Sequence, residues 1–301
     1  MTNNIALSLV SVKSGVGAGR LGAELGPDNI IQAGLIRRLN QLGYTNIDDL
    51  QVSSSLQQAA SQGTSKAKNR EGVIDVCRQL SEQVDESITK GNFPLILGGD
   101  HSIAMGSIAG LTKHYKNLGV IWFDAHTDIN TEESSPTGNM HGMPLAVALG
   151  RAELKIADIN KDACELKPEN IVIIGARDLD QAEKEIIRSL GITCFTMHEI
   201  DRMGMGKVME EALRIVQNGT DGVHLSFDLD SVDPQEAPGT GTPVPGGVSY
   251  REAHFALELM YESGLITSAE FVEVNPTLDI NNKTTRLTIE LISSLLGKRI
   301  L

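Results

Sequence analysis

Cysteine is scarce in the 301-residue sequence, basic residues are outnumbered by acidic ones, and long apolar runs are missing. Cys77, Cys164 and Cys194 are too few and too scattered for a disulfide framework, and no CxxC pair indicates a zinc or thiol-redox site. No apolar stretch approaches the roughly 18 residues that a membrane-spanning helix needs. The amino terminus has no basic segment followed by an apolar one, so a secretion signal is not expected. We therefore expect a cytoplasmic protein in a reducing compartment.

The charge balance excludes two further classes of partner. The sequence has 26 Lys and Arg residues against 39 Asp and Glu residues, which gives a formal net charge of −13. Because an acidic surface repels phosphate backbones and anionic lipids, we expect neither a nucleic acid nor a membrane as partner. The length and the 41% of hydrophobic residues are sufficient for a large buried core, so a folded globular protein is expected.

Short β-rich runs alternate with amphipathic stretches along the whole chain. This alternation is typical of an α/β fold in which a mostly parallel sheet is flanked by helices on both faces. No composition shift marks a boundary, and residues 1–301 are interpreted as a single domain. The predicted strands are 5–12, 93–97, 119–123, 170–174, 193–196, 222–227 and 267–272. The predicted helices are 28–42, 73–88, 181–190, 207–216, 249–263 and 284–296, and the polar segment 53–70 is predicted to be an exposed loop.

Three of the predicted strands are followed by residues that can bind metal ions. These segments are GGDHS (98–102), DAHTD (124–128) and SFDLD (226–230). The carboxyl ends of the strands form the ligand-binding edge of an open α/β sheet, so the three segments can converge there. Residues at i and i+2 of an extended segment project to the same side, so the acidic and imidazole side chains of one segment can face a common centre.

The composition of this cluster favours a carboxylate-rich metal site. Aspartate oxygens with a minority of imidazole suit hard or borderline divalent ions such as Mn²⁺, whereas Zn²⁺ favours more nitrogen or sulfur ligands. Packed carboxylates would repel one another, and two divalent cations would balance the charge of four of them. Taken singly, Asp100 could be the N-cap of a tight turn, and residues 228–230 could be a solvated loop. The remaining histidines are interpreted as packing or surface residues: His114, His198, His224 and His254.

As a set, these motifs resemble those of the ureohydrolase family, and within it they look most like those of the arginases. The resemblance extends from Gly26-Pro27 through GGDHS, DAHTDIN, TGNMHGMP, GARDLD, SFDLDSVDP and GTGTPVPGG to EVNP. It implies a single α/β domain with a parallel sheet of about eight strands and a binuclear manganese cluster. It also implies assembly as a homo-trimer or homo-hexamer.

The resemblance implies a role for each residue of the cluster. One Mn²⁺ would be held by His101, Asp124, Asp128 and Asp228, and the other by Asp124, His126, Asp228 and Asp230. Asp124 and Asp228 would bridge the ions, and a hydroxide between them, from a water whose pKa falls to roughly 7, would attack the substrate. Asp128 would hydrogen-bond the attacking group, His141 would carry protons, and Glu273 would bind the guanidinium. Without the surrounding motifs, His141 would be interpreted as a surface-loop histidine and Glu273 could be a solvated carboxylate.

The resemblance also implies which residues recognise the amino-acid end of L-arginine. In arginases the DINT…TGNMHG segment binds the α-carboxylate, and an acidic residue after GARDL receives the α-amine. The substrate-binding residues implied here are Asn130, Thr137, Asn139, Asp180, Glu183, Thr242 and Glu273. Thr137 stands where arginases often have Ser, which keeps the hydroxyl but can alter affinity, and Ser134 and Ser135 leave open which hydroxyl makes the contact. Asn130 and Asp180 could equally cap turns.

The expected function is that of a manganese-dependent enzyme, with two Mn²⁺ per subunit, that hydrolyses L-arginine to L-ornithine and urea. One alternative is another ureohydrolase, such as an agmatinase or a formimidoylglutamase. Another is a non-catalytic homologue that binds arginine or metal. A dinuclear phosphoesterase would share the metal chemistry, but it needs cationic groups for an anionic substrate, and none cluster beside these motifs.

Overall fold

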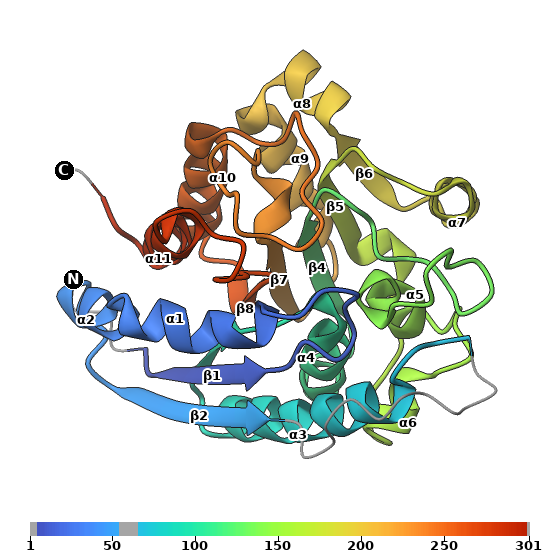
Figure 1. The fold of residues 1–301 in the computed structure, drawn as a ribbon, viewed down its shortest axis with the longest axis horizontal. Helices are drawn as coiled ribbons and strands as arrows, with labels where there is room; N and C mark the ends of the chain where they lie inside the picture. Colours follow the sequence, from blue (N-terminus) through green and yellow to red (C-terminus); the bar gives the residue numbers. More distant parts are fainter. Residues whose placement is uncertain (1–4, 54–65, 300–301) are drawn as a thin grey trace.

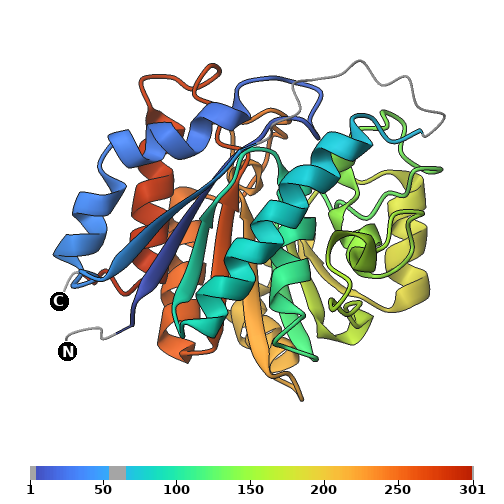
Figure 2. The ribbon, with the colours of Figure 1, turned by 90° about the horizontal axis from the view of Figure 1, so that it is seen from below.

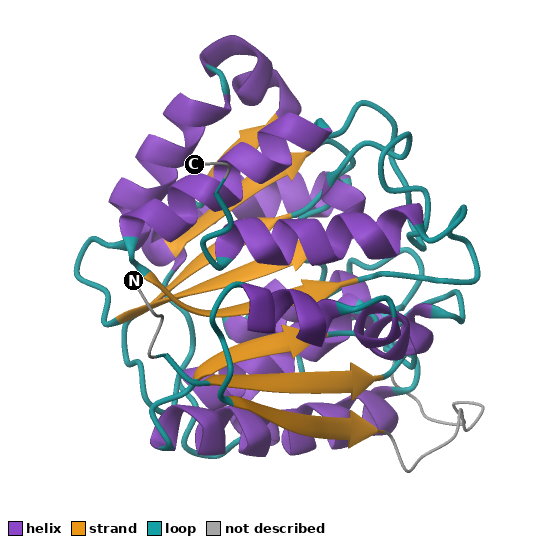
Figure 3. Cartoon of the chain, turned by 90° about the vertical axis from the view of Figure 1, so that its left-hand side faces the viewer, coloured by secondary structure: helices purple, strands orange, loops and turns teal. Residues whose placement is uncertain are grey.

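Eight parallel strands form one continuous sheet in the computed structural model, which describes residues 5–53 and 66–299. The strand order is β2-β1-β3-β8-β7-β4-β5-β6, and every neighbouring pair is parallel. Figure 3 shows the strand arrows pointing the same way, with loops beyond their tips. The strands are β1 (Leu7–Lys13), β2 (Ile47–Ser53), β3 (Phe93–Leu97), β4 (Leu118–Phe123), β5 (Ile171–Ala176), β6 (Thr193–Thr196), β7 (Gly222–Asp228) and β8 (Ile266–Val272). The prediction of a parallel α/β sheet of about eight strands is confirmed.

Strand β2 lies outside every predicted strand, and its position in the sheet explains why. It is an edge strand that pairs with β1, and Val52 is its one fully buried residue. An edge strand exposed on one side needs no continuous apolar run. In β2, Asp48 and Asp49 interrupt the apolar pattern from which a buried strand is predicted. Strands covered on both faces were predictable; β4 and β5, for example, are buried along their whole length. The other edge strand, β6, is only half-buried but contains no charged residue.

Helices cover both faces of the sheet, as Figures 1 and 2 show. Alternate residues of each strand point to opposite faces: in β4, Val120 and Trp122 pack into one core and Ile121 and Phe123 into the other. The helices of the first face are α3 (Arg70–Thr89), α4 (Ala104–Leu111), α5 (Pro144–Ala148), α6 (Ile156–Ile159) and α7 (Gln181–Leu190). Those of the second face are α1 (Gly26–Gln32), α2 (Leu35–Gln41), α8 (Met197–Met203), α9 (Met205–Val216), α10 (Tyr250–Ser263) and α11 (Lys283–Leu295).

The helix predicted over residues 28–42 is two helices, which corrects that prediction. Gly34 lies between α1 and α2 with a φ of 111°, in the left-handed region that glycine adopts at little cost. The chain therefore turns between the two helices, and both Ile30 and Leu35 still pack into the same core. The apolar residues do have helical spacing, but the glycine between them ends the first helix.

Several elements escaped prediction for identifiable reasons. All residues of α4 are buried, so it has no polar face to produce an amphipathic pattern. The helices α5, α6 and α8 are too short for a periodic signal. Of the predicted loop 53–70, residues 54–65 lie outside the described residues, Ser53 ends β2, and Arg70 begins α3.

The strand order determines where the predicted site forms. Strands β3, β8, β7 and β4 are consecutive neighbours in the middle of the sheet, and their carboxyl ends lead into the segments that contain the candidate ligands. Among the helices of residues 5–53 and 66–299, none is both long enough and apolar enough to cross a membrane.

The first loop of the site depends on Gly99, which follows β3. A Cβ atom at this position would overlap the backbone carbonyl oxygen of Ser14, which already accepts a hydrogen bond from Asp100 N (2.9 Å). We expect Gly99→Ala to lower the free energy of unfolding by about 3 kcal/mol or more, because two backbones must move apart. Urea unfolding measures the change. Gly72→Ala is the matched control: it meets no atom closer than 4.0 Å and lies within α3, so it should be neutral or stabilising. Equal effects of the two substitutions would contradict this account.

Candidate active site

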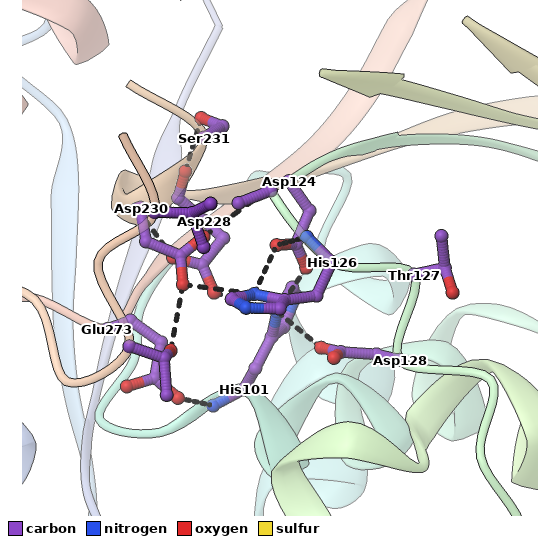
Figure 4. Close-up of polar contacts among 12 residues, drawn as sticks. His101, Asp124, His126, Thr127, Asp128, Asp228, Asp230, Ser231 and Glu273 are labelled. Atoms are coloured by element: carbon purple, nitrogen blue, oxygen red, sulfur yellow. Dashed lines mark hydrogen bonds and ion pairs between the residues drawn. The ribbon is translucent and has the colours of Figure 1, made fainter. Parts of the chain in front are cut away.

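The side chains predicted to bind metal converge at the carboxyl end of the sheet. Two groups of ligand atoms each lie within 4.8 Å of one another, one from His101, Asp124 and Asp228 and one from Asp124, His126 and Asp230. Figure 4 shows these five side chains pointing toward one another, whereas Thr127 points away. Asp124 belongs to both groups. Asp228, for which the family resemblance also implies a bridging position, belongs to the first of the two groups found in the described part of the chain.

The geometry around His101 fits a metal ion. Its Nδ1 atom lies 3.2 Å from Asp124 Oδ2, 3.0 Å from Asp128 Oδ2 and 3.1 Å from Asp228 Oδ2. This nitrogen is buried, and among the described residues it has no hydrogen-bond partner. A buried ring nitrogen that faces carboxylate oxygens without hydrogen-bonding to them can, together with those oxygens, coordinate a cation. The mixture of oxygen donors with imidazole suits an ion such as Mn²⁺.

The electrostatics of the protein groups alone also favour bound cations. Burial, together with the charge of Asp124, raises the pKa of Asp128 to about 7. Burial and the charges of Asp230 and Asp124 raise the pKa of Asp228 well above its usual range. Burial opposes the imidazolium form of His126, but the carboxylates of Asp230 and Asp124 raise its pKa above the usual value. The crowded carboxylates therefore attract positive charge, which two divalent ions would supply.

Neighbouring groups fix the orientation of the shared ligand Asp124. Its Oδ2 atom accepts a hydrogen bond from Trp122 Nε1 (3.0 Å), and its Oδ1 atom accepts one from His126 N (2.8 Å). The Trp122 ring also stacks on His101, with centroids 4.1 Å apart and planes 6° apart. Two of the three ligands of the first group, His101 and Asp124, are thus held in place by one buried indole.

Glu273 and His141 form a pair beside the candidate metal ligands. Oε1 of Glu273 accepts a hydrogen bond from His101 N (2.9 Å) and lies 3.0 Å from His141 Nδ1. Burial opposes charge on both groups, but their pairing raises the pKa of His141 to about 9 and lowers that of Glu273. Glu273 is 2% exposed, so it is not the solvated carboxylate that the sequence also allowed.

Asp128 and Glu273 both have left-handed backbone conformations, with φ of 49° and 66°. This region is unfavourable for residues with a Cβ atom, by roughly 1 kcal/mol or more each. Hydrogen bonds from Leu145 N to Asp128 O (3.0 Å) and from Glu273 N to Gly99 O (2.8 Å) hold the two backbones. The fold thus directs these two carboxylates toward the cluster although their backbone conformations are unfavourable.

A pocket opens beside the cluster and is lined by six of the seven predicted substrate residues, whereas Glu273 lines an adjoining hollow. Its lining includes His126, Asp128, Asn130, Ser135, Thr137, Asn139, His141, Asp178, Asp180, Glu183, Asp228 and Thr242. Among the described residues, neither Lys nor Arg lines it, although Arg20 lines an adjoining hollow that also reaches Glu273. The lining is therefore acidic and polar, which disfavours an anionic phosphoester as substrate.

The amino-acid end of the pocket is built on the start of α7. Asp180 is the N-cap of this helix, and its Oδ2 atom accepts a hydrogen bond from Asn130 Nδ2 (2.9 Å). Glu183 completes a capping box by accepting from Asp180 N (2.9 Å), and its Oε1 atom accepts from the Thr127 hydroxyl (2.9 Å). Asp180 is therefore both a cap and a pocket residue, so the two interpretations that the sequence left open are compatible.

The structure separates the hydroxyl groups that the sequence could not distinguish. The Ser134 hydroxyl donates to Asn130 Oδ1 (2.7 Å) and so holds that amide in place. Ser135 and Thr137 line the pocket, and each accepts a backbone hydrogen bond, from Gly138 N and Asn139 N respectively. Thr242 also lines the pocket and donates to Asp230 Oδ2 (2.9 Å).

Other residues that support the site were not assigned a role from the sequence. Asp178 lines the pocket, and its position within GARDLD is the signal that could have identified it. The Arg177 guanidinium donates to the carbonyl oxygens of Gly175, Asp230, Ser231 and Val244, and so ties together the loops after β5 and β7. Glu270 is fully buried near His101, and its signal is a charged residue within the otherwise uncharged strand β8.

Comparisons with known proteins agree with this geometry. The model of the arginase family matches residues 4–297. The arginase of Bacillus subtilis is 50% identical over 295 residues, which cover 98% of this chain and 99% of that protein. The solved structure of Bacillus caldovelox arginase is 48% identical, with a TM-score of 0.95 over 99% of this chain and 100% of that chain. The structure of Entamoeba histolytica arginase in complex with L-ornithine is 32% identical, with a TM-score of 0.90 over 97% of this chain and 99% of that chain.

Proposed function

The chain belongs to the arginase family, and we propose on this premise that it hydrolyses L-arginine to L-ornithine and urea with two Mn²⁺ ions. The observation that carries the proposal is the pair of ligand groups sharing Asp124, placed directly beside Glu273 and His141. The relatives named arginase, together with the relative solved with L-ornithine, support the substrate and the amino-acid product.

The residues proposed to hold the metal ions are His101, Asp124, His126, Asp128, Asp228 and Asp230. When bound, the ions would make hydroxide available from water near neutral pH and would stabilise the negative charge of the attacking oxygen. Trp122 and His126 N orient Asp124 for this purpose. The donor set favours Mn²⁺ over Zn²⁺ because four of its six members are carboxylates.

The reaction needs a charge partner for the substrate and a proton for the leaving amine. Glu273 is buried and negatively charged, so it pairs with the planar guanidinium and holds its carbon beside the metal ligands. Asp128 lies within the cluster, where its carboxylate accepts a hydrogen bond from the attacking group. His141, with a pKa raised to about 9, is protonated near neutral pH and supplies the proton for the departing amine.

Selectivity for arginine is proposed to lie at the other end of the pocket. Asp180, supported by Glu183, receives the α-amine as an acceptor of charge-assisted hydrogen bonds. Asn130, Thr137 and Asn139 supply polar contacts for the α-carboxylate. The hydrogen bonds from Ser134 to Asn130 and from Asn130 to Asp180 hold this end of the pocket in a fixed shape.

We further propose that the protein works in the cytoplasm and assembles as a homo-trimer or homo-hexamer. The three scattered cysteines, which form no disulfide framework in the sequence, support a reducing location. Size-exclusion chromatography with light scattering measures the assembly.

Urea release from arginine, agmatine and guanidinobutyrate by the Mn²⁺-loaded protein tests the proposed function. We expect strong preference for arginine. Preference for agmatine or guanidinobutyrate would indicate another ureohydrolase, and binding of arginine without urea release would indicate a non-catalytic homologue. Hydrolysis of an activated phosphate ester would favour the phosphoesterase alternative.

An Asp180→Asn variant isolates the recognition of the α-amine. Asn is as good an N-cap as Asp, so α7 should keep its start while the pocket loses a charge. We expect KM for arginine to rise roughly 10-fold to 100-fold, as for loss of a hydrogen bond to a charged group, and KM for agmatine to change little. Steady-state urea assays with both substrates measure the difference. A similar increase for agmatine would show that Asp180 does not contact the α-amine.

A further inference from the structure

Glu270 is a buried charge that the proposed reaction does not use. It lies in the body of β8, is 0% exposed, and stands three residues before Glu273. Burying a carboxylate is costly unless it is hydrogen-bonded or paired with a positive charge. The contacts of the Glu270 carboxylate therefore indicate its role.

The contacts of Glu270 lead directly to a candidate metal ligand. Its Oε1 atom accepts a hydrogen bond from the Ser226 hydroxyl at 2.7 Å. The same hydroxyl oxygen lies 2.8 Å from Nε2 of His101. All three residues are buried, so no solvent competes for these bonds. Glu270 thus reaches the far nitrogen of the His101 ring through one serine.

The protons available to Glu270, Ser226 and His101 determine which atom donates in each of the two hydrogen bonds that link them. A serine hydroxyl has one proton, and an ionised carboxylate can only accept. Burial opposes ionisation, but contacts that include His224 and Ser107 lower the pKa of Glu270, so it is ionised at neutral pH. Ser226 therefore donates to Glu270 and accepts from His101, which places the ring proton on Nε2. Nδ1 then keeps its lone pair, and Nδ1 is the atom that faces the three aspartates.

The far side of Glu270 is held by a second set of buried groups. Its Oε2 atom accepts from the Ser107 hydroxyl of α4 at 2.5 Å. His224 Nε2 lies 3.5 Å from Oε1, and the other ring nitrogen of His224 lies 2.9 Å from the Ser268 hydroxyl. The carboxylate is thus contacted from α4 and β7, and the bond from Ser107 is only one of several that hold it.

We propose that Glu270 is a positioning residue for the metal centre, which makes Ser226 a hydrogen-bond acceptor and thereby holds His101 in the tautomer whose Nδ1 binds metal. This inference rests on the proposed function, because it needs the cluster to bind metal. It assigns a purpose to the buried charge, which is to keep the Nε2 proton in place so that Nδ1 is the nitrogen available to the ion.

Replacement of Glu270 by Met tests the proposal. Met has nearly the same length and no acceptor that competes with nitrogen, so Ser226 becomes free to donate to His101 Nε2 and the ring proton is driven to Nδ1. We expect the dissociation constant of the Mn²⁺ ion held by the His101 group to rise about 10-fold to 100-fold, measured from the electron paramagnetic resonance signal of free Mn²⁺. Glu270→Gln can still place its carbonyl toward Ser226, so its effect should be smaller.

Two controls separate positioning from general stability. Ser107→Ala removes the hydrogen bond to the other oxygen of Glu270 and should leave Mn²⁺ affinity within about threefold of the original. In a Ser226→Ala background, Glu270→Met should cause no further loss of affinity, because the connection to His101 is already broken. The melting temperature of the metal-free protein should not fall in step with the affinity.

The possible failures are distinguishable. Two results would overturn the positioning role while the proposed function stands. One is unchanged Mn²⁺ affinity in Glu270→Met, and the other is that Glu270→Met lowers the affinity as much in the Ser226→Ala background as in the original protein. Losses of affinity that follow the metal-free melting temperature, and that Ser107→Ala shares, also overturn it. An unmutated protein that binds no Mn²⁺ overturns both this inference and the proposed function.

Discussion

An Asp124→Asn variant is expected to lose at least about 10³-fold in kcat/KM for arginine, or ~4 kcal/mol of transition-state stabilisation. Asp124 is the residue common to both ligand groups, so a single substitution weakens both. The Asn side chain has one acceptor oxygen, so it keeps only one of the hydrogen bonds from Trp122 and His126 N. The substitution therefore removes the negative charge, one ligand oxygen and one orienting hydrogen bond. Urea release at saturating Mn²⁺ measures the effect.

The Asp124→Asn variant should also lose most of the increase in melting temperature that Mn²⁺ causes. A ligand that binds the folded state alone stabilises it by about 2.7 kcal/mol at a concentration 100 times its dissociation constant. The protein should therefore melt at a higher temperature with Mn²⁺ than after chelation, and Asp124→Asn should lose most of that difference. Asp201→Asn removes an exposed charge from α8 and serves as the control, with activity and melting difference unchanged. A fully active Asp124→Asn protein would exclude the proposed metal centre.

A Glu273→Gln variant is expected to have the second largest effect, a loss of roughly 10²-fold to 10³-fold in kcat/KM for arginine. Removing one partner of a buried, hydrogen-bonded charge pair costs about 2 to 5 kcal/mol. Gln is nearly isosteric and can still accept from His101 N, so the site should keep its shape while the guanidinium loses its counter-charge. Because agmatine has the same guanidinium, its hydrolysis should fall by a similar factor.

The Glu273→Gln variant should also change the titration of His141. The carboxylate raises the pKa of this imidazole to about 9, and its removal should lower that pKa toward the ordinary value of roughly 6.5. Nuclear magnetic resonance of ¹⁵N-labelled histidine follows the titration directly. Glu236→Gln, which removes a surface carboxylate paired with Lys283, is the control for loss of charge and should leave the titration in place. An unchanged His141 pKa in Glu273→Gln would show that the two groups are not paired in solution.

The sequence was most informative where chemistry and local structure share a short segment. The metal-binding candidates after β4 occupy alternate positions directly behind a buried apolar strand, so pattern and residue type point to the same conclusion. The family resemblance added the roles of distant residues such as Glu273, and the family membership it implied is confirmed. Local patterning therefore predicted which residues gather, and the resemblance predicted what they do.

Contacts that depend on strand order could not be predicted in this way. Nothing in the sequence states that β8 lies between β3 and β7, and that arrangement is what brings Glu270 within reach of Ser226 and His101. The choice among neighbouring hydroxyls was equally inaccessible, because Ser134 and Thr137 differ in their partners rather than in their local pattern. Such contacts are set by packing between elements that are far apart in the chain.

The position of β8 has a consequence for how the protein is made. Of the eight strands in the described residues, this one is synthesised last, yet it joins β2-β1-β3 to β7-β4-β5-β6. The growing chain must therefore keep two unjoined half-sheets, each with an open edge, until residues 266–272 emerge to close the gap. Nascent polypeptides released before that point would have neither a continuous sheet nor the carboxylate at position 273, so they would be inactive and prone to aggregate.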